Sequence, residues 1–254
     1  MFESAPFFSL EGQTAIVTGG ATGLGLGITR CIVGAGGKAI VIARSEGDVA
    51  ALNELGDHAA FYRFDITDTD HSQEIVDQII SDHGNISILV NNAGIHRKKP
   101  IEEMTVEDFN AVLNVHLVGA FSLTKAVIPH MKANKKGSVL FQASMTSFIG
   151  QPFVAGYSTA KAGYLGLMRT LAAECGAFGV RVNAIAPGWI DTPMFHQATD
   201  TDPARMQKIL GRIPMNTIGD PMDIGLAAVF LCSDAARYIN GVCLPVDGGA
   251  LIGL

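Results

Sequence analysis

The sequence predicts an α/β fold in which helices cover both faces of one doubly wound, seven-stranded parallel sheet. Short runs rich in β-branched and apolar residues recur along the 254 residues, and longer helical patterns separate them. Most of these runs are apolar at every position, as expected for a parallel sheet that is covered on both sides. The predicted strands are residues 14–18, 39–43, 61–65, 86–91, 138–143, 181–185 and 242–246.

Amphipathic helices fill the segments between the predicted strands, and residues 68–83 show the pattern most clearly. Their apolar stripe consists of Ile75, Val76, Ile79 and Ile80, and Gly84 marks its end. Alternating strands and helices imply right-handed crossovers, which build a doubly wound sheet. Because no linker, low-complexity tract or block of like charges divides the chain, we expect a single domain over residues 1–254.

The composition excludes several classes of protein. Hydrophobic residues make up 48% of the chain and charged residues 17%, which excludes a disordered chain. The net charge of −6 offers no basic surface to nucleic acid or an anionic membrane, and no apolar stretch approaches the ~20 residues of a membrane span. The four cysteines form no C-x-x-C pair, and no signal peptide begins the sequence. We therefore expect a cytoplasmic protein with reduced thiols and no catalytic metal.

One irregular stretch, residues 188–214, follows the sixth predicted strand. It contains Trp189, Pro193, Met194, Phe195 and His196. Loops that leave the carboxyl ends of parallel strands usually carry the ligand site. Because of its aromatic content, we expect this segment to be a lid that covers a site and not merely a long surface loop.

A glycine-rich turn, TGGATGLG at residues 18–25, joins the first predicted strand to the first helix. Glycines permit a tight turn and let the backbone approach a pyrophosphate, whose charge a helix N-terminus favours. The turn is also compatible with a simple sharp connection, but its place in the chain favours a dinucleotide site. The residues that would form it are Gly19, Thr22, Gly23, Leu24 and Gly25.

The motif T-G-x-x-x-G-x-G resembles the cofactor motif of the classical short-chain dehydrogenase/reductase family. Further motifs follow in that family's order: Asn91-Asn92-Ala93-Gly94, Ser144, Tyr157-x-x-x-Lys161, Pro187-Gly188 and Asp247-Gly248-Gly249. The resemblance covers essentially the whole chain and implies a Rossmann-type fold and an NAD(P)-dependent oxidoreductase. It also implies that Asp65 and Ile66 flank the adenine, Asn91 and Gly94 the ribose, and Ile190 and Thr192 the carboxamide. Pro187 and Gly188 would complete the cofactor site.

The cofactor is expected to be NADP in preference to NAD. An acidic residue at the end of the second strand would accept hydrogen bonds from the adenosine ribose and select NAD. This sequence has Arg44 there, and a guanidinium suits a 2′-phosphate. A solvated arginine at a strand end is the competing interpretation, and Thr22 stands where many NADP-preferring relatives have a second basic residue.

Tyr157 and Lys161 are four residues apart in a predicted helix and therefore share a face. A nearby ammonium favours the tyrosinate, and bringing a tyrosine pKa from ~10 to about 7 requires roughly 4 kcal/mol. Tyr157 would remove the alcohol proton during oxidation or donate it during reduction. The resemblance implies that Lys161 also holds the nicotinamide ribose, and that Ser144 orients the substrate oxygen.

One position departs from the family pattern. The family's catalytic asparagine stands five residues before a phenylalanine, here Phe121, and this sequence has His116 at that position. Asn114 lies two positions earlier, where a helical side chain points in a different direction. In the family, the backbone carbonyl of the asparagine holds a water of the proton relay, and histidine has the same carbonyl. Activity should therefore survive, and the imidazole is either structural or functional.

A cationic run follows the Asn-Asn-Ala-Gly motif: His96, Arg97, Lys98 and Lys99. Its fixed charges could meet a carboxylate such as that of a sugar acid. His96 and Arg97 are the better candidates, while Lys98 and Lys99 fit a solvated loop; Trp189 and Met194 are candidates from the lid. Short loops, including residues 95–100 and 143–148, are similar to gluconate 5-dehydrogenase and 2-deoxy-D-gluconate 3-dehydrogenase members of the family.

Three functions compete on the sequence. The first is a dehydrogenase of a sugar acid, sugar or polyol, which the cationic run favours. The second is a reductase of a 3-oxoacyl thioester or another hydrophobic ketone, which the apolar lid favours. The third is a non-catalytic dinucleotide-binding sensor, which His116 favours and an intact Ser144, Tyr157 and Lys161 oppose. The resemblance implies a homotetramer whose interfaces use the helices with His116 and Tyr157 and the C-terminal strand region.

Overall fold

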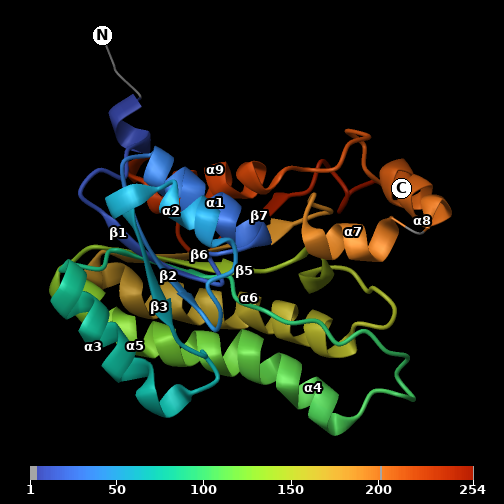
Figure 1. Ribbon diagram of the computed structural model, residues 1–254, viewed down its shortest axis with the longest axis horizontal. Helices are drawn as coiled ribbons and strands as arrows, with labels where there is room; N and C mark the ends of the chain where they lie inside the picture. Colours follow the sequence, from blue (N-terminus) through green and yellow to red (C-terminus); the bar gives the residue numbers. More distant parts are fainter. Residues whose placement is uncertain (1–4, 201, 254) are drawn as a thin grey trace.

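The computed structural model describes residues 5–200 and 202–253, and its centre is one sheet of parallel strands (Figure 1). The strand order is β3-β2-β1-β4-β5-β6-β7, and all pairs are parallel. The strands are β1 Thr14–Thr18, β2 Lys38–Ala43, β3 Ala59–Arg63, β4 Ile88–Asn91, β5 Gly137–Gln142, β6 Val180–Pro187 and β7 Cys243–Val246. The prediction of a seven-stranded, doubly wound parallel sheet is confirmed.

Helices cover both faces of this sheet (Figure 1). One face carries α1 (Gly23–Gly34), α2 (Val49–Asn53) and α9 (Pro221–Cys232). The other carries α3 (Ser72–His83), α4 (Val106–Leu113), α5 (Ala120–Ala133) and α6 (Ala155–Cys175). Two further helices, α7 (Pro193–Thr199) and α8 (Pro203–Arg212), lie beyond β6 in the segment expected to form a lid.

The strands are buried because both of their faces meet helices. Every residue of β1, β4 and β5 is buried, which explains why these runs are apolar without alternation. One apolar cluster lies between the sheet and α3, α5 and α6, and a second lies between the sheet and α1 and α9. The sheet is therefore a rigid platform whose edges position the loops.

Two element boundaries differ from the sequence prediction. The strand expected at 61–65 is observed two residues earlier, at Ala59–Arg63, because β3 pairs with β2 from Ala39 onward and follows directly on a 3₁₀ turn. The helix expected from residue 68 begins with a 3₁₀ turn and becomes α-helical only at Ser72. Its predicted end is confirmed, since Gly84 adopts a φ of 76°.

The segment Val106–Ala133 is continuously helical, with a π-helical turn, Asn114–Gly119, between α4 and α5. By length and composition alone it passes the test for a membrane span, which the sequence prediction did not anticipate. Half of its most apolar window is buried inside the fold, and it packs against α3 and α6 as a core helix does.

The strand order reverses between β1 and β4, which creates a crevice at the carboxyl ends of these strands. In open α/β sheets this reversal is where ligands bind. Most of the predicted site residues follow the carboxyl ends of β1, β2, β3, β4, β5 and β6.

Candidate active site

The turn between β1 and α1 leaves a space along its backbone that side chains at the glycine positions would fill. Gly19 and Gly23 adopt φ angles of 64° and 51°, a region that favours glycine. A Cβ on Gly25 would lie 2.0 Å from the carbonyl oxygen of Gly19. Thr22 precedes the 12-residue α1 without a side-chain cap, so its hydroxyl does not occupy the first-turn amides. These features fit a dinucleotide pyrophosphate.

Two distant segments border this turn. Cγ2 of Thr192 lies 3.8 Å from where a Cβ of Gly23 would stand, and Ala21 lies 2.7 Å from where a Cβ of Gly47 would stand. The loop after β2 therefore packs on the glycine turn. Arg44, at the start of this loop, is exposed and has no hydrogen-bond or ion-pair partner within residues 5–200 and 202–253. Its guanidinium is free to bind an external anion.

Other predicted cofactor residues follow β3 and β4. The carboxylate of Asp65 accepts hydrogen bonds from the amide and hydroxyl of Thr67 at 3.0 and 2.8 Å. Ile66 is buried beside it. Asn91 ends β4, is buried and donates to Oγ1 of Thr124 at 3.0 Å. Its Oδ1 has no partner among the described residues.

A third group follows β6 and borders the chain's C-terminal turn. Pro187 ends β6, and a Cβ on Gly188 would lie 2.7 Å from Cα of Asp247. The carboxylate of Asp247 accepts two backbone amides and fixes its own turn. Ile190 is buried, and Leu24 packs against the core beneath α1 and α9. The Asp-Gly-Gly motif thus supports this loop.

Ser144, Tyr157 and Lys161 lie together where β5 and α6 meet. The hydroxyl of Ser144 lies close enough to that of Tyr157 to lower the pKa of the phenol. The buried Lys161 lies four residues further along α6, with Nζ 5.4 Å from the centroid of the Tyr157 ring. Its ammonium donates to the backbone carbonyl of Gln142, the last residue of β5. One hydroxyl pair therefore stands beside one buried amine.

Ser147, three residues after Ser144, has a different role. Its hydroxyl donates to the backbone carbonyl of Lys161 at 2.8 Å and lies 3.3 Å from the amide of Ser144. It therefore ties the turn after β5 to α6. Ser144 is left as the serine whose hydroxyl meets Tyr157.

Burial controls the protonation of this group. Desolvation raises the pKa of Tyr157, and the hydrogen bond with Ser144 opposes that rise. Desolvation also lowers the pKa of Lys161 to about 7. The sequence argument expected the ammonium to lower the tyrosine pKa. Within the chain alone burial outweighs that effect, so Tyr157 is protonated at neutral pH.

His116 is buried on the π-helical turn, while Asn114 is exposed. Its Nε2 lies 3.2 Å from the amide nitrogen and 3.0 Å from the carbonyl oxygen of Ile95, so it bonds Ile95 in either tautomer. Burial and the charge of Lys161 lower its pKa to about 3. The ring meets Tyr157 edge-on at 5.5 Å, and Nδ1 has no partner among the described residues.

One carboxylate that the sequence analysis did not identify, that of Asp108, pairs with two residues of the cationic run. Asp108 accepts from Nζ of Lys99 at 2.6 Å and lies 3.9 Å from Nε of Arg97. Asp108 also completes the N-terminal capping box of α4, and that sequence signal could have located it. Lys98 lies 6.0 Å from the ring of Phe153, and His96 stacks on Tyr157.

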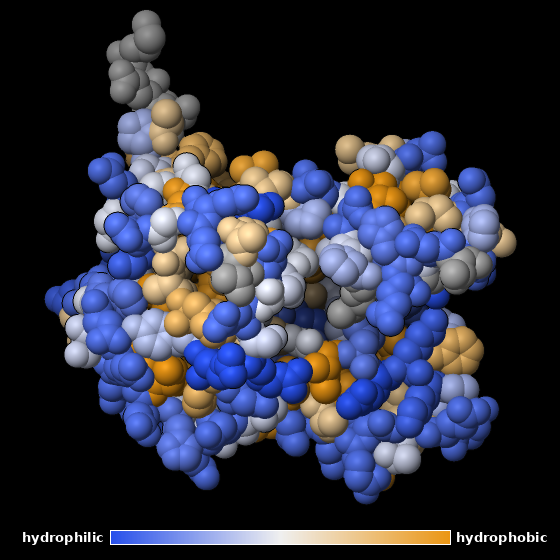
Figure 2. All heavy atoms as spheres, viewed as in Figure 1, coloured by the Kyte–Doolittle hydropathy of each residue, from blue (hydrophilic) through white to orange (hydrophobic). Residues whose placement is uncertain are grey.

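The lid segment packs its apolar side chains next to the site. Trp189 and Phe195 join a cluster with Met145, which directly follows Ser144. The side chain of Met194 lies outside the described part of the structure. Figure 2 shows the surface hollowed between the lobe with α7 and α8 and the body of the molecule.

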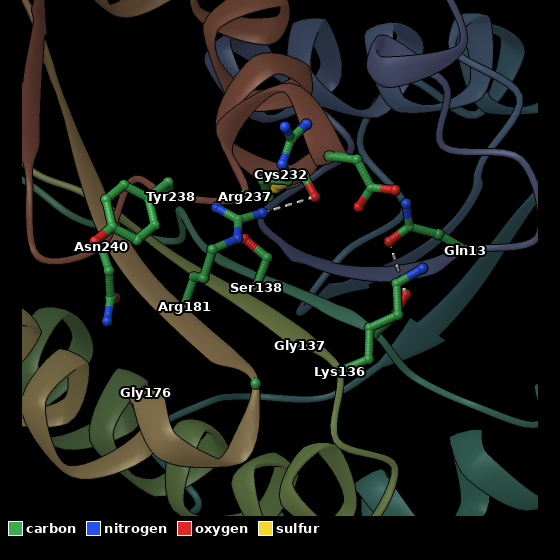
Figure 3. Close-up of a pocket in the computed structure, with 13 residues that line it drawn as sticks. Gln13, Lys136, Gly137, Ser138, Gly176, Arg181, Cys232, Arg237, Tyr238 and Asn240 are labelled. Carbon is green, nitrogen blue, oxygen red and sulfur yellow. Dashed lines mark hydrogen bonds between the residues drawn. The ribbon is translucent and has the colours of Figure 1, made fainter.

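A separate cavity of about 570 Å³ lies at the opposite edge of the sheet, near the amino ends of β5 and β6 (Figure 3). The guanidinium of Arg181, one of two arginines that line it, donates to the carbonyls of Leu231, Cys232 and Ser233 at the end of α9. Asn240 likewise bonds two backbone groups. These polar groups hold the fold together and are remote from Tyr157. Among the described residues, no cluster of His, Cys, Asp and Glu suits a metal ion.

Comparisons with known proteins agree with this geometry. A family model described as enoyl-(acyl carrier protein) reductase matches residues 19–250. The chain is 40% identical over 247 residues to the 2-dehydro-3-deoxy-D-gluconate 5-dehydrogenase of Pseudoalteromonas atlantica, covering 95% of this chain and 97% of that protein. It is 35% identical over 248 residues to the 3-oxoacyl-[acyl-carrier-protein] reductase FabG of Thermotoga maritima, covering 96% and 99%.

A solved structure is also similar over its whole length. The gluconate 5-dehydrogenase from Burkholderia cenocepacia, in complex with NADP and tartrate, superposes with a TM-score of 0.94 at 30% identity. The match covers 99% of this chain and 100% of that chain.

Proposed function

The chain belongs to the short-chain dehydrogenase/reductase family of NAD(P)-dependent oxidoreductases, and from this premise we propose that it transfers hydride between NADP and a secondary alcohol or ketone of a sugar acid, sugar or polyol. The observation that carries the proposal is the buried Lys161 with Nζ 5.4 Å from the centroid of the Tyr157 ring, together with the Ser144 hydroxyl that faces the phenol. These residues follow β5, next to the crevice that carries the glycine turn. A non-catalytic sensor has no physical need for this arrangement.

NADP is favoured over NAD by the position of Arg44. Its guanidinium, at the start of the loop whose Gly47 packs on the glycine turn, has no partner among the described residues and suits a 2′-phosphate. Gly19, Gly23 and Gly25 would receive the pyrophosphate on their backbone. The remaining cofactor contacts would come from Thr22, Leu24, Asp65, Ile66, Asn91, Gly94, Pro187, Gly188, Ile190 and Thr192. A bound NADP in the Burkholderia cenocepacia relative supports this choice.

Tyr157 and Ser144 act on the reacting oxygen of the substrate. The Ser144 hydroxyl holds that oxygen beside the Tyr157 hydroxyl, which gives up its proton in reduction and takes one in oxidation. The nicotinamide, when bound, supplies or accepts the hydride, and its positive ring favours the tyrosinate. Lys161 places its ammonium beneath the phenol ring. The bond from this ammonium to the carbonyl of Gln142 keeps it in position.

His116 stays neutral in this mechanism. With its pKa near 3, the imidazole exchanges no proton at neutral pH, and its Nε2 fixes the loop at Ile95. The backbone carbonyl of residue 116 remains available for a relay water whichever side chain is present. His116 is therefore a replacement that keeps the catalytic architecture.

The proposed substrate class follows from the polar side chains near the site. The ammonium of Lys98, 6.0 Å from the ring of Phe153, offers a positive charge to a carboxylate, whereas Asp108 engages Arg97. The relative from Pseudoalteromonas atlantica supports a sugar-acid substrate. The alternative is a 3-oxoacyl thioester, which the apolar cluster with Trp189 and Phe195 and the relative from Thermotoga maritima support.

For the assembly we propose a cytoplasmic homotetramer of single-domain chains, in which residues 188–214 act as the lid. Exposed apolar side chains support two interfaces, on α4–α5 and around α9 and β7; they are Val106, Val118, Phe121, Met222, Leu226 and Val242. The free cysteines support a reducing compartment.

The test is the absorbance of the reduced nicotinamide, followed with NADP and with NAD against sugar acids, polyols and 3-oxoacyl esters. We expect turnover with gluconate-like acids and NADP, and a shift towards NAD in Arg44→Asp. Turnover confined to 3-oxoacyl esters would select the alternative substrate. Unchanged discrimination in Arg44→Asp would remove the 2′-phosphate argument, and cofactor binding without any turnover would favour the sensor.

A further inference from the structure

The imidazole of His96 lies flat against the phenol ring of Tyr157. The ring centroids are 4.0 Å apart and the planes are inclined by only 25°. The edge of His116 meets the same phenol at 5.5 Å. Tyr157 is thus held between two imidazoles while its hydroxyl meets Ser144. Such contacts restrict the rotation of a tyrosine ring about its side-chain bonds.

The loop that carries His96 is fixed on both sides of this residue. Ile95, just before it, is bonded by the buried His116. Lys99, three residues after it, pairs with Asp108 and donates its amide to the carbonyl of Phe153 at 2.9 Å. Asp108 is itself fixed by the capping box of α4. The position of His96 over Tyr157 therefore follows from three contacts that anchor the loop on either side of it.

We propose that His96 is a positioning residue for Tyr157: its stacked ring holds the phenol in the orientation that presents its hydroxyl to Ser144 and the substrate. This inference rests on the proposed function, since it concerns the acid–base residue of that reaction. It assigns the role to the ring and not to the ring nitrogens. The pairing of Lys99 with Asp108 acts as a strap that keeps the ring in place.

The stack works with a neutral imidazole. The charged or titratable groups around His96 are Lys161 below Tyr157, Lys98 on its own loop, and His116, which is neutral. Burial and the two lysines lower the pKa of His96, so it carries no charge at neutral pH. A neutral ring packs on the phenol without competing with Lys161 for the tyrosinate.

The experiment compares His96→Phe, which keeps a flat ring, with His96→Ala, which removes it. We expect kcat of the alanine variant to fall about tenfold, with KM and the cofactor Kd nearly unchanged, because misorientation of an acid–base group slows the chemical step. The phenylalanine variant should recover kcat to within about threefold. Lys99→Met should lower kcat in the same direction and add little to His96→Ala. The matched control is His58→Ala, at an exposed histidine in another turn, which should change nothing.

Each outcome bears on the proposal. Loss in both His96 variants, or a higher KM with unchanged kcat, would make His96 a substrate contact and overturn positioning. A kcat within twofold of the parent in His96→Ala would also overturn it. If the parent enzyme turns over no substrate, the proposed function fails, and the stack is then judged by the pKa of Tyr157 in ¹³C-tyrosine spectra. That pKa should fall in His96→Ala, because solvent reaches the phenol, and stay in His96→Phe; equal values in both variants would contradict the stack.

Discussion

At the scale of single residues, the buried Lys161 serves the chemistry of the site and lowers the stability of the fold. Its ammonium is buried, bonds one backbone carbonyl, and faces the rings of Tyr157 and Tyr164 at 5.4 and 5.0 Å. Among the described residues no carboxylate pairs with it. Burial accordingly lowers its pKa from 10.5 to about 7. A group held this way destabilises the fold wherever it is charged in the unfolded chain.

We expect Lys161→Met to abolish turnover and to raise the free energy of unfolding by a few kcal/mol at pH 6 to 7. The sign follows from proton binding: between pH 7 and 10.5 the unfolded chain holds a proton on this lysine that the folded chain lacks, so stability of the parent rises with pH there. The advantage of the variant should therefore shrink as pH rises towards 10. Urea unfolding at several pH values measures it, and a variant less stable than the parent at pH 6 would show that the buried ammonium does not destabilise the fold.

Gly94 and His116 form a second contact that single substitutions can test. A Cβ on Gly94 would lie 2.1 Å from Cε1 of the buried His116. We expect Gly94→Ala to lower the free energy of unfolding by about 1–3 kcal/mol through overpacking. The double variant with His116→Asn should recover most of this loss, because the shorter side chain clears the space. A double-mutant cycle with no coupling energy would refute the contact, and His116→Asn alone should keep its activity.

Sequence spacing identified the residues of this site that act through one local element. Tyr157 and Lys161 share a helix face, so their spacing alone brings them together. Their relation to His96 depends on how the loop after β4 folds over α6, and no spacing reports that. The spacing does not reveal the partner of Arg97 either, because Asp108 belongs to a helix cap and not to the cationic run.

At the scale of elements, a π-helical turn between α4 and α5 carries His116 into the site. A regular helix from α4 into α5 would keep a repeat of 3.6 residues, and one π turn shifts the register between the two helices. On this turn His116 and Gly119 are buried, while Asn114 and Val118 are exposed. Apolar periodicity predicted the strands well because it depends on burial. It did not reveal the π turn, which alters one turn within an otherwise helical segment.

The lid carries its own ionic contact at the start of α7. His196 pairs with Asp191 before the helix and with Asp200 at its end, at 2.5 and 2.9 Å. Both carboxylates raise the pKa of His196, with Asp200 contributing most.

This contact predicts that the lid is held more firmly below neutral pH. A histidine whose folded pKa is raised stabilises the fold below its unfolded pKa of about 6.5, and that contribution disappears as pH rises through the folded value. Amide exchange within α7 should therefore quicken as pH passes above that value, after correction for intrinsic exchange. His196→Gln should remove the pH dependence; the same profile in this variant would show that other groups cause it.

At the scale of the whole molecule, the site is assembled from most of the chain. The glycine turn, Asn91, Ser144 and the loop after β6 follow different strands, and only the parallel sheet brings their carboxyl ends to one edge. The fold class and the placement of these motifs could be predicted because the central strands β1, β4 and β5 are buried throughout and most of the motifs follow a strand. Contacts between a loop and a helix, such as His96 on Tyr157, form only when the segments that connect the strands pack against one another.

The most direct test of the proposed mechanism is the turnover of Tyr157→Phe, measured alongside its cofactor affinity. This change removes only the hydroxyl that exchanges a proton with the substrate and leaves the ring that packs on His96 and His116. We expect kcat to fall by about 10² to 10⁴, the usual contribution of an acid–base group, with the NADP dissociation constant within about twofold of the parent. A variant that keeps most of its rate would contradict the assignment of Tyr157 and the mechanism built on it.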